Sequence, residues 1–289
     1  MPETPDFVTI FEMGPRDGLQ NEKTLISTDD KIRLVDMLSE CGFRKIEVTS
    51  FVSPKWVPQM ADAADVLEGI YRRPSVTYTA LTPNVKGYTA AKRAFAEEVA
   101  IFGSASEGFS IKNINCSVAE SIERFKPLIE KAHHDGMPVR GYVSCVTDCP
   151  YDGPTPPEAV ARVAKLLYEL GCYEISLGDT IGTGTPETIS AMLDAVLTEI
   201  PTRHLAGHYH DTKGQALDNI SVSLDKGLRT FDAAIGGLGG CPYAPGAKGN
   251  VATEAVSDLM AHKGFDTGLN RDKLVEASHF ALSLRNSQS

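Results

Sequence analysis

The chain has 289 residues, of which 42% are hydrophobic and 23% charged, as is usual for soluble globular proteins. Its formal net charge of -10 argues against nucleic acid as a partner, because phosphate binding needs a basic surface. No apolar run reaches the roughly 18 to 20 residues of a membrane helix, so no membrane association is expected.

Six cysteines are present, and none of them forms a C-x-x-C pair, which excludes zinc-ribbon and thioredoxin-type sites. The first ten residues lack the basic and apolar segments of a secretion signal. We therefore expect a cytoplasmic protein whose cysteines are mostly free and buried.

Eight short β-rich or apolar segments alternate with longer amphipathic stretches. In chain order they are Val8–Met13, Lys45–Ser50, Ser75–Leu81, Glu98–Gly103, Val139–Val146, Glu174–Gly178, Leu205–His210 and Thr230–Ile235. Alternation of strands and helices implies a parallel sheet. Eight units, in a chain of this length, favour a closed (β/α)₈ TIM barrel over an open doubly wound sheet.

The segments between these strands carry helical patterns. Apolar residues recur at helical spacing in Thr28–Cys41, and Thr185-Pro186 begins another helix. The run Thr155–Glu158 predicts a capping box at the start of a helix that ends at Gly171. The tail, Arg271–Ser289, is expected to add a C-terminal helix. No linker or low-complexity tract interrupts the pattern, so residues 1–289 are predicted to form one catalytic domain.

Polar residues gather where these strands end, and in a (β/α)₈ barrel the catalytic groups lie at that rim. They are Arg16 and Asp17 after the first strand, Glu47 in the second, Asp179 at the end of the sixth, His208 and His210 at the end of the seventh, and Cys241 and Asn250 beyond the eighth. Although far apart in sequence, they are predicted to face one rim.

The pair His208 and His210 indicates a metal site. Strand side chains two positions apart face the same way, so both imidazoles can meet one ion. Asp17 and Asn250 would complete a set of two nitrogens, a carboxylate and an amide oxygen. This mixed set without thiolate suits Mg²⁺ or Mn²⁺ better than structural zinc.

Arg16 and the glycine-rich segment after the last strand have two interpretations each. Arg16 can hold the rim together as a salt-bridge partner of Glu47, or stabilise a developing enolate oxygen, or do both. The segment Ile235–Pro242 opens no helix at its third glycine, so it is no dinucleotide motif and is expected to be a flexible loop. A cysteine on such a loop, Cys241, could transfer protons.

At this point the chain resembles the 3-hydroxy-3-methylglutaryl-CoA (HMG-CoA) lyase family of metal-dependent barrel lyases. Six blocks in family order carry the resemblance: EMGPRDGLQNE at 12–22, IEVTSFVSPK at 46–55, SLGDTIG at 176–182, GHYHDT at 207–212, GLGGCP at 237–242 and GN at 249–250. They run over nearly the whole chain, and jointly they are specific to the family.

The resemblance implies a role for each matching residue. Asp17, His208, His210 and Asn250 would hold Mg²⁺ or Mn²⁺. Arg16 would stabilise the enolate of acetyl-CoA, positioned by Glu47. Cys241 would transfer a proton, and Asp179 would lie near the substrate hydroxyl. Asn113 and Tyr142 would touch the acyl-CoA substrate. The expected reaction cleaves HMG-CoA to acetoacetate and acetyl-CoA, in leucine breakdown or ketone-body formation.

Three alternatives stay open at this stage. A related lyase for a longer or branched 3-hydroxy-3-acylglutaryl-CoA would keep the same catalytic set. A Claisen-type synthase would join acetyl-CoA to a 2-oxo acid, although such enzymes usually carry a sizeable C-terminal region. A non-catalytic CoA-binding scaffold would have no need of the intact ligand set. The sequence leaves self-association into a homo-oligomer open.

Overall fold

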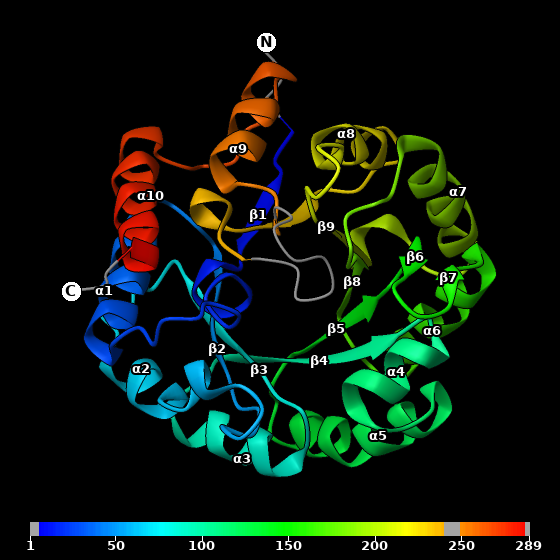
Figure 1. Cartoon of the computed structure of the whole chain (residues 1–289), viewed down its shortest axis with the longest axis horizontal. Helices are drawn as coiled ribbons and strands as arrows, with labels where there is room; N and C mark the ends of the chain where they lie inside the picture. Colours follow the sequence, from blue (N-terminus) through cyan, green and yellow to red (C-terminus); the bar gives the residue numbers. More distant parts are fainter. Residues whose placement is uncertain (1–5, 240–248, 287–289) are drawn as a thin grey trace.

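The computed structural model describes residues 6–239 and 249–286, and in these ranges eight parallel strands close into a barrel. The strands are β1 Thr9–Glu12, β2 Lys45–Ser50, β3 Thr77–Leu81, β4 Glu98–Ser104, β5 Val139–Ser144, β8 Glu174–Asp179, β9 Leu205–Tyr209 and β10 Thr230–Ala233. Figure 1 shows them as a ring surrounded by helices. The predicted TIM barrel is confirmed, with all eight strands close to their expected positions.

The strands run in chain order around the ring, and β10 closes the barrel by pairing with β1. This closure joins Thr9–Glu12 to Thr230–Ala233 over four residue pairs. On its other side β1 pairs with β2 at a single position, Glu12 with Ile46. Because every strand is parallel to its neighbours, their carboxyl ends share one rim.

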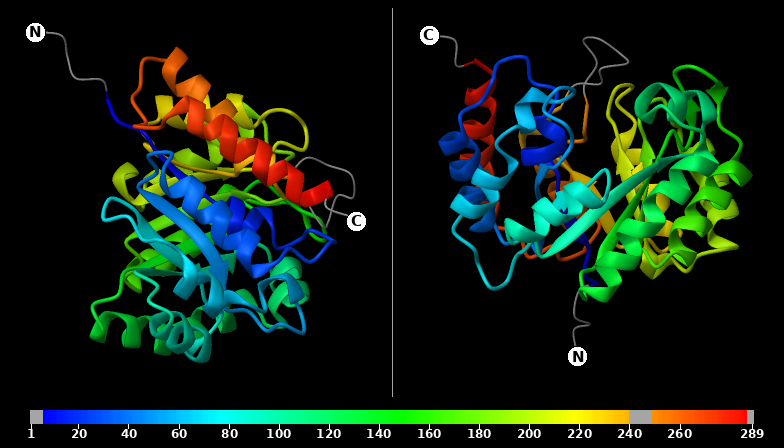
Figure 2. Two further views of the ribbon diagram at one scale, coloured as in Figure 1. Left: turned by 90° about the vertical axis from the view of Figure 1, so that its left-hand side faces the viewer. Right: turned by 90° about the horizontal axis from the view of Figure 1, so that it is seen from below.

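Helices cover the outside of the ring. They are α1 Thr28–Ser39, α2 Ala63–Gly69, α3 Val85–Arg93, α4 Glu107–Ile114, α5 Val118–His134, α6 Pro157–Glu169, α7 Pro186–Leu197, α8 Ala216–Asp225, α9 Thr253–His262 and α10 Arg271–Asn286. The main hydrophobic cluster lies between them and the strands. The C-terminal helix α10 packs against α1, as Figures 1 and 2 show. No helix in the described ranges is long and apolar enough to cross a membrane.

The predicted capping box at Thr155 is wrong. Helix α6 begins one residue later than expected, with Pro156 at the N-cap position and no side-chain cap. Thr155 is held elsewhere, since its backbone N–H donates to the carbonyl of Thr147 (2.8 Å). That bond belongs to a small hairpin, β6 Asp148–Cys149 and β7 Gly153–Pro154, which periodicity did not predict. The predicted helix start at Thr185-Pro186 is confirmed, and Thr185 forms a capping box with Thr188 at the start of α7.

Short helical turns complete the structure at both ends of the barrel. They are η1 Gly14–Gly18, η2 Pro58–Met60, η3 Thr202–His204 and η4 Ile235–Gly237. Turn η4 begins the segment that was expected to be a flexible loop. Gly236 and Gly237 both have φ of +61°, a conformation that favours glycine, and Ile235 is buried. The first part of that segment is therefore an ordered turn.

Candidate active site

The turn η1 carries Arg16 and Asp17 directly above the end of β1. It is a single π-helical turn, closed by the Gly18 N–H donating to the carbonyl of Met13 (3.1 Å). Buried Glu12 fixes its start by accepting from the N–H of Gly14 (2.8 Å). A Cβ at position 14 would lie 2.6 Å from Glu12 Oε1, so the turn needs glycine there.

Arg16 is buried between two carboxylates. Its Nε donates to Glu47 Oε2, its Nη1 donates to Asp17 Oδ1, and its guanidinium lies over the ring of Tyr142. Burial opposes its charge, but Glu47 and Asp17 outweigh that effect and hold the pKa of Arg16 above its usual value. The guanidinium thus stays charged at the mouth of the pocket.

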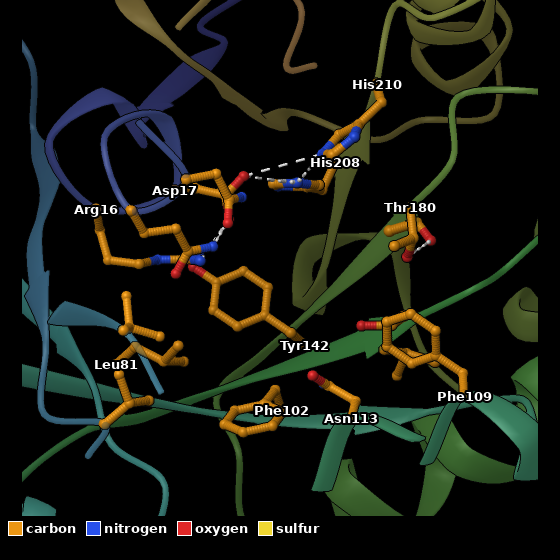
Figure 3. A pocket seen from close by; sticks show the side chains of 17 residues that line it. Arg16, Asp17, Leu81, Phe102, Phe109, Asn113, Tyr142, Thr180, His208 and His210 are labelled. Carbon is orange, nitrogen blue, oxygen red and sulfur yellow. Dashed lines mark hydrogen bonds and ion pairs between the residues drawn. The ribbon is translucent and has the colours of Figure 1, made fainter. Parts of the chain in front are cut away.

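Asp17 faces the histidine pair. Its Oδ2 lies 3.9 Å from Nε2 of His208 and 3.9 Å from Nε2 of His210, and the two Nε2 atoms are 3.3 Å apart. Figure 3 shows the three side chains converging from η1 and from the end of β9. Their ligand atoms all lie within 4.8 Å of one another, which is the spacing of groups around one ion.

The chemistry of this trio fits a divalent cation. Burial lowers the pKa of His210 to about 4, so its imidazole is neutral near pH 7 and can offer a lone pair. Burial alone would raise the pKa of Asp17, but Arg16 and both histidines hold it well below its usual range, as an anionic oxygen ligand requires. Two nitrogens and one carboxylate are a donor set that leaves coordination positions open.

Asn250 joins this group from the start of the second described range, residues 249–286. Its backbone bridges that of His210, and its Nδ2 donates to Asp17 Oδ2 (2.8 Å) and to the carbonyl of Leu238 (3.3 Å). The sequence predicted Asn250 as a ligand through oxygen. In this arrangement its amide nitrogen instead steadies the carboxylate that faces the histidines.

A pocket opens beside the trio at the same rim. Its walls include Leu81, Phe102 and Phe109, with Asn113 at its exposed outer edge and Thr180 opposite (Figure 3). Of the two predicted substrate contacts, Asn113 lines the pocket with its amide. Tyr142 lines it with its ring, because its hydroxyl is bonded to Glu47 (3.1 Å) and Arg140 (3.0 Å).

Glu47, Asn250 and Asp179 do not line the pocket themselves; the first two bond to Arg16 and Asp17, which do. Asp179 is fully buried and accepts from Thr147 Oγ1 (2.7 Å) and the N–H of Gly184 (2.9 Å). Strand alternation turns it away from the barrel axis, so its placement speaks against direct contact with the substrate. Cys241 lies outside the described residues.

The sequence interpretation missed a charged pair inside the barrel. Arg140 of β5 and Asp232 of β10 are buried and form a two-bond ion pair (2.8 and 3.0 Å). Asp232 Oδ2 also lies 3.1 Å from Nδ1 of His208. A signal was available, because each is a charged residue within an otherwise apolar predicted strand, and Arg140 stands two residues before Tyr142.

Comparison with known proteins decides the family. A family model described as HMGL-like matches residues 7–281. The chain belongs to the HMG-CoA lyase family. Among this family's members, the bovine (Bos taurus) mitochondrial hydroxymethylglutaryl-CoA lyase is 58% identical over 276 residues, which are 96% of this chain and 85% of the bovine protein. The resemblance stated from the sequence blocks is confirmed.

Solved structures of HMG-CoA lyases share the same barrel. The enzyme from Brucella melitensis is 61% identical, with a TM-score of 0.97 over 98% of this chain and 100% of that one. A lyase from Acinetobacter baumannii, solved in complex with coenzyme A and 3-methylmalate, is 36% identical, with a TM-score of 0.94 over 100% and 94% of the two chains.

Proposed function

We propose that this chain cleaves HMG-CoA to acetoacetate and acetyl-CoA, using the rim formed by η1 and the end of β9. The observation that carries the proposal is the convergence of Asp17, His208 and His210 beside a pocket that also contains the Arg16 guanidinium. The names of the relatives, at 55 to 61% identity over most of the chain, supply the substrate.

Asp17, His208 and His210 would hold the cation, with Asn250 as a fourth ligand if its amide oxygen turns toward them. A bound Mg²⁺ or Mn²⁺ would supply Lewis acidity to a substrate oxygen. The donor set of nitrogen and oxygen atoms, without a thiolate, favours these two ions.

The chain's own residues would then serve the bond cleavage. The C3 hydroxyl loses its proton to a base at the rim, the C2–C3 bond breaks, and its electron pair passes into the enolate of acetyl-CoA while acetoacetate gains its carbonyl. Arg16, fixed by Glu47, offers a permanent positive charge to that enolate oxygen. Cys241 would return a proton to the enolate carbon, as the family resemblance implies.

For Asp179 we propose a structural role in place of contact with the substrate hydroxyl. Its two oxygens hold Thr147 and the backbone at Gly184, so it would fix the loop that follows β8. Thr180, which comes next in the chain, is then presented to the pocket.

The direct test is an assay of HMG-CoA cleavage in the presence and absence of Mg²⁺ and Mn²⁺. We expect acetoacetate and acetyl-CoA to appear only with the metal. Absence of metal-dependent acetoacetate release would contradict the proposal. Thioesters with longer acyl groups at C3 should be poorer substrates, since each extra methylene is worth about 1–3 kcal/mol in a fitted pocket. Acetyl-CoA with 2-oxo acids should release no CoA.

The remaining expectations are still predictions. The main hydrophobic cluster runs from Val8 to Leu284, which supports one catalytic domain over the chain. The curated relatives include both mitochondrial and cytoplasmic lyases, so the cytoplasmic location and the homo-oligomer rest on the sequence interpretation alone. Roles in leucine breakdown or ketone-body formation follow from the proposed reaction.

A further inference from the structure

A network of buried charges lies inside the barrel, beneath the histidine pair. At its centre is Asp232, which is 2% exposed and accepts from Arg140 at both of its oxygens. Its Oδ2 also accepts from Ser176 Oγ (2.7 Å) and faces Nδ1 of His208 at 3.1 Å. Arg140, itself fully buried, completes its bonds with Glu174 (2.8 Å).

This contact decides which nitrogen of His208 carries the proton. The bonds from Arg140 and Ser176 show that the carboxylate of Asp232 acts as an acceptor, so Nδ1 of His208 is the donor in the remaining contact. In a neutral imidazole the other nitrogen then has a free lone pair. That nitrogen, Nε2, is the atom that points at Asp17 and His210.

We propose that Asp232 is the positioning residue of the metal site: it fixes the tautomer and the ring orientation of His208, and Arg140 holds Asp232 in place. The proposal rests on the metal site of the proposed function, but it concerns a contact inside the chain. Carboxylates in this position behind a ligand histidine keep its lone pair aimed at the ion.

The second histidine, His210, has no such partner in the described ranges, which sets apart the contact between Asp232 and His208. Nδ1 of His210 is buried and has no hydrogen-bond partner among the residues that the structure describes. No described group therefore fixes the tautomer of His210, whereas His208 faces a carboxylate that Arg140 and Ser176 hold through three hydrogen bonds. The orientation of the pair depends on the one histidine that is anchored.

The variant Asp232→Asn isolates this role because it keeps size and shape. The new amide nitrogen meets a donor of Arg140 at either oxygen position, and at Oδ1 its printed neighbour is that donor alone. At Oδ2 its two N–H groups can be accepted, because Ser176 can turn its hydroxyl and Nδ1 of His208 can accept once its own proton moves to Nε2. The lone pair toward the metal is then lost. We expect Mn²⁺ affinity to fall by about 10- to 100-fold.

The experiment combines two measurements on the full chain. Mn²⁺ binding is measured by the loss of the free-ion signal in electron paramagnetic resonance, and the tautomer of His208 by ¹⁵N NMR of histidine-labelled protein without added metal. Wild-type His208 should carry its proton on Nδ1, and Asp232→Asn should carry it on Nε2. The matched control is Glu174→Gln, which alters the other carboxylate on Arg140 but touches no atom of His208; it should keep Mn²⁺ affinity within about threefold.

Two results would overturn the proposal: a wild-type His208 protonated on Nε2, or a folded Asp232→Asn variant that binds Mn²⁺ like wild type. The first measurement needs no variant, so it decides the matter even if Asp232→Asn does not fold. It also separates this proposal from the proposed function. A wild-type chain that binds no Mn²⁺ would contradict the metal site, while the tautomer of His208 would still test the contact with Asp232.

Discussion

A single side chain, Arg16, connects the two chemical parts of the pocket rim. Its guanidinium donates hydrogen bonds to Asp17 and to Glu47. Asp17 faces the histidines, and Glu47 also accepts a hydrogen bond from the hydroxyl of Tyr142. Through Tyr142 the same chain of contacts reaches Arg140 and the buried network. Arg16 is therefore placed both to stabilise negative charge and to keep Asp17 in position.

We expect Arg16→Gln to lower kcat about 10²- to 10³-fold, the usual loss when one donor to a developing oxyanion is removed, with a smaller change in KM. Without the guanidinium, the pKa of Glu47, which burial already raises, should rise further. Steady-state kinetics with HMG-CoA tests this. The control is Arg162→Gln on the exposed face of α6, which should keep wild-type kinetics. A variant at position 16 with unchanged kcat would exclude the role in the enolate step.

At the scale of residues, the sequence predicts those site residues whose side chains lie at the end of a predicted strand. Asp17, His208 and His210 were predicted to meet because strand ends share a rim and alternate side chains share a face, and the structure brings them together. Asp232 could not be identified in this way. Its function depends on a partner from another strand, and spacing along one strand does not say which strand lies opposite.

At the scale of elements, Glu12 joins three pieces of the structure. It is fully buried and accepts from the N–H of Gly14 in η1 (2.8 Å), the N–H of Ile235 in η4 (2.8 Å) and Thr253 Oγ1 at the start of α9 (2.6 Å). Burial raises the pKa of Glu12 from 4.5 to about 7. The charge of the carboxyl group that links η1, η4 and α9 therefore changes with pH near neutrality.

The sign follows from linkage. The folded chain holds the Glu12 proton up to about pH 7 and the unfolded chain only to about pH 4.5, so the carboxyl group disfavours folding progressively as pH rises between these values. The full loss is about 3 kcal/mol above pH 7. Glu12→Gln mimics the protonated form: its oxygen can accept from the two backbone N–H groups while its nitrogen donates to Thr253.

We therefore expect Glu12→Gln to match wild type in free energy of unfolding near pH 4.5 and to exceed it at pH 8, by at most about 3 kcal/mol. Urea unfolding at the two pH values, with chelator present, measures the difference. The partly exposed neighbour Glu254, which bonds to Gly236, provides the control variant Glu254→Gln. An equal loss of stability at both pH values would show that the ionised carboxylate is what the three elements need.

The strands were predicted well because a single effect, burial of both faces, determines their sequence pattern. Each strand is apolar or β-rich because it is buried on both faces, and its position followed from that pattern. The start of α6 was wrong because two local signals competed. Thr155 has the chemistry of a cap, but the hairpin of β6 and β7 binds its backbone first, and the helix starts after Pro156.

At the scale of the whole molecule, the proposed cation joins segments from opposite ends of the chain, so its binding should stabilise the complete fold. At a free concentration 100 times its Kd, a ligand contributes about 2.7 kcal/mol. For a chain of this size, that corresponds to a rise in Tm of about 5 °C. Thermal unfolding with and without saturating Mn²⁺ should show this difference.

The shift should disappear in His210→Ala, which removes one nitrogen from the trio. The control is His204→Ala, because His204 lies at the amino end of β9 and bonds to the carbonyl of Tyr173 (2.8 Å), away from the trio. It should keep the full rise in Tm. A rise that persists in His210→Ala would place the stabilising ion elsewhere in the molecule.

The barrel as a whole was predictable because eight alternations of strand and helix allow few arrangements. The chemistry of its interior was not. Arg140, Glu174 and Asp232 lie within the barrel, where apolar side chains are usual, and only the closed ring shows that Arg140 pairs with both carboxylates.

The closure of β1 against β10 has a consequence for how the protein is made. The ribosome produces β1 among the first residues, yet β1 has one paired position with β2 and must wait for β10 to supply the rest. The hydrogen bonds of Asp17 with Asn250 and of Glu12 with Thr253 also cannot form until the later residue of each pair has been synthesised. At about 5–20 residues per second, these partners emerge roughly 10–50 s later. For that time the nascent chain exposes an open strand edge, so we expect chaperones to matter most during translation.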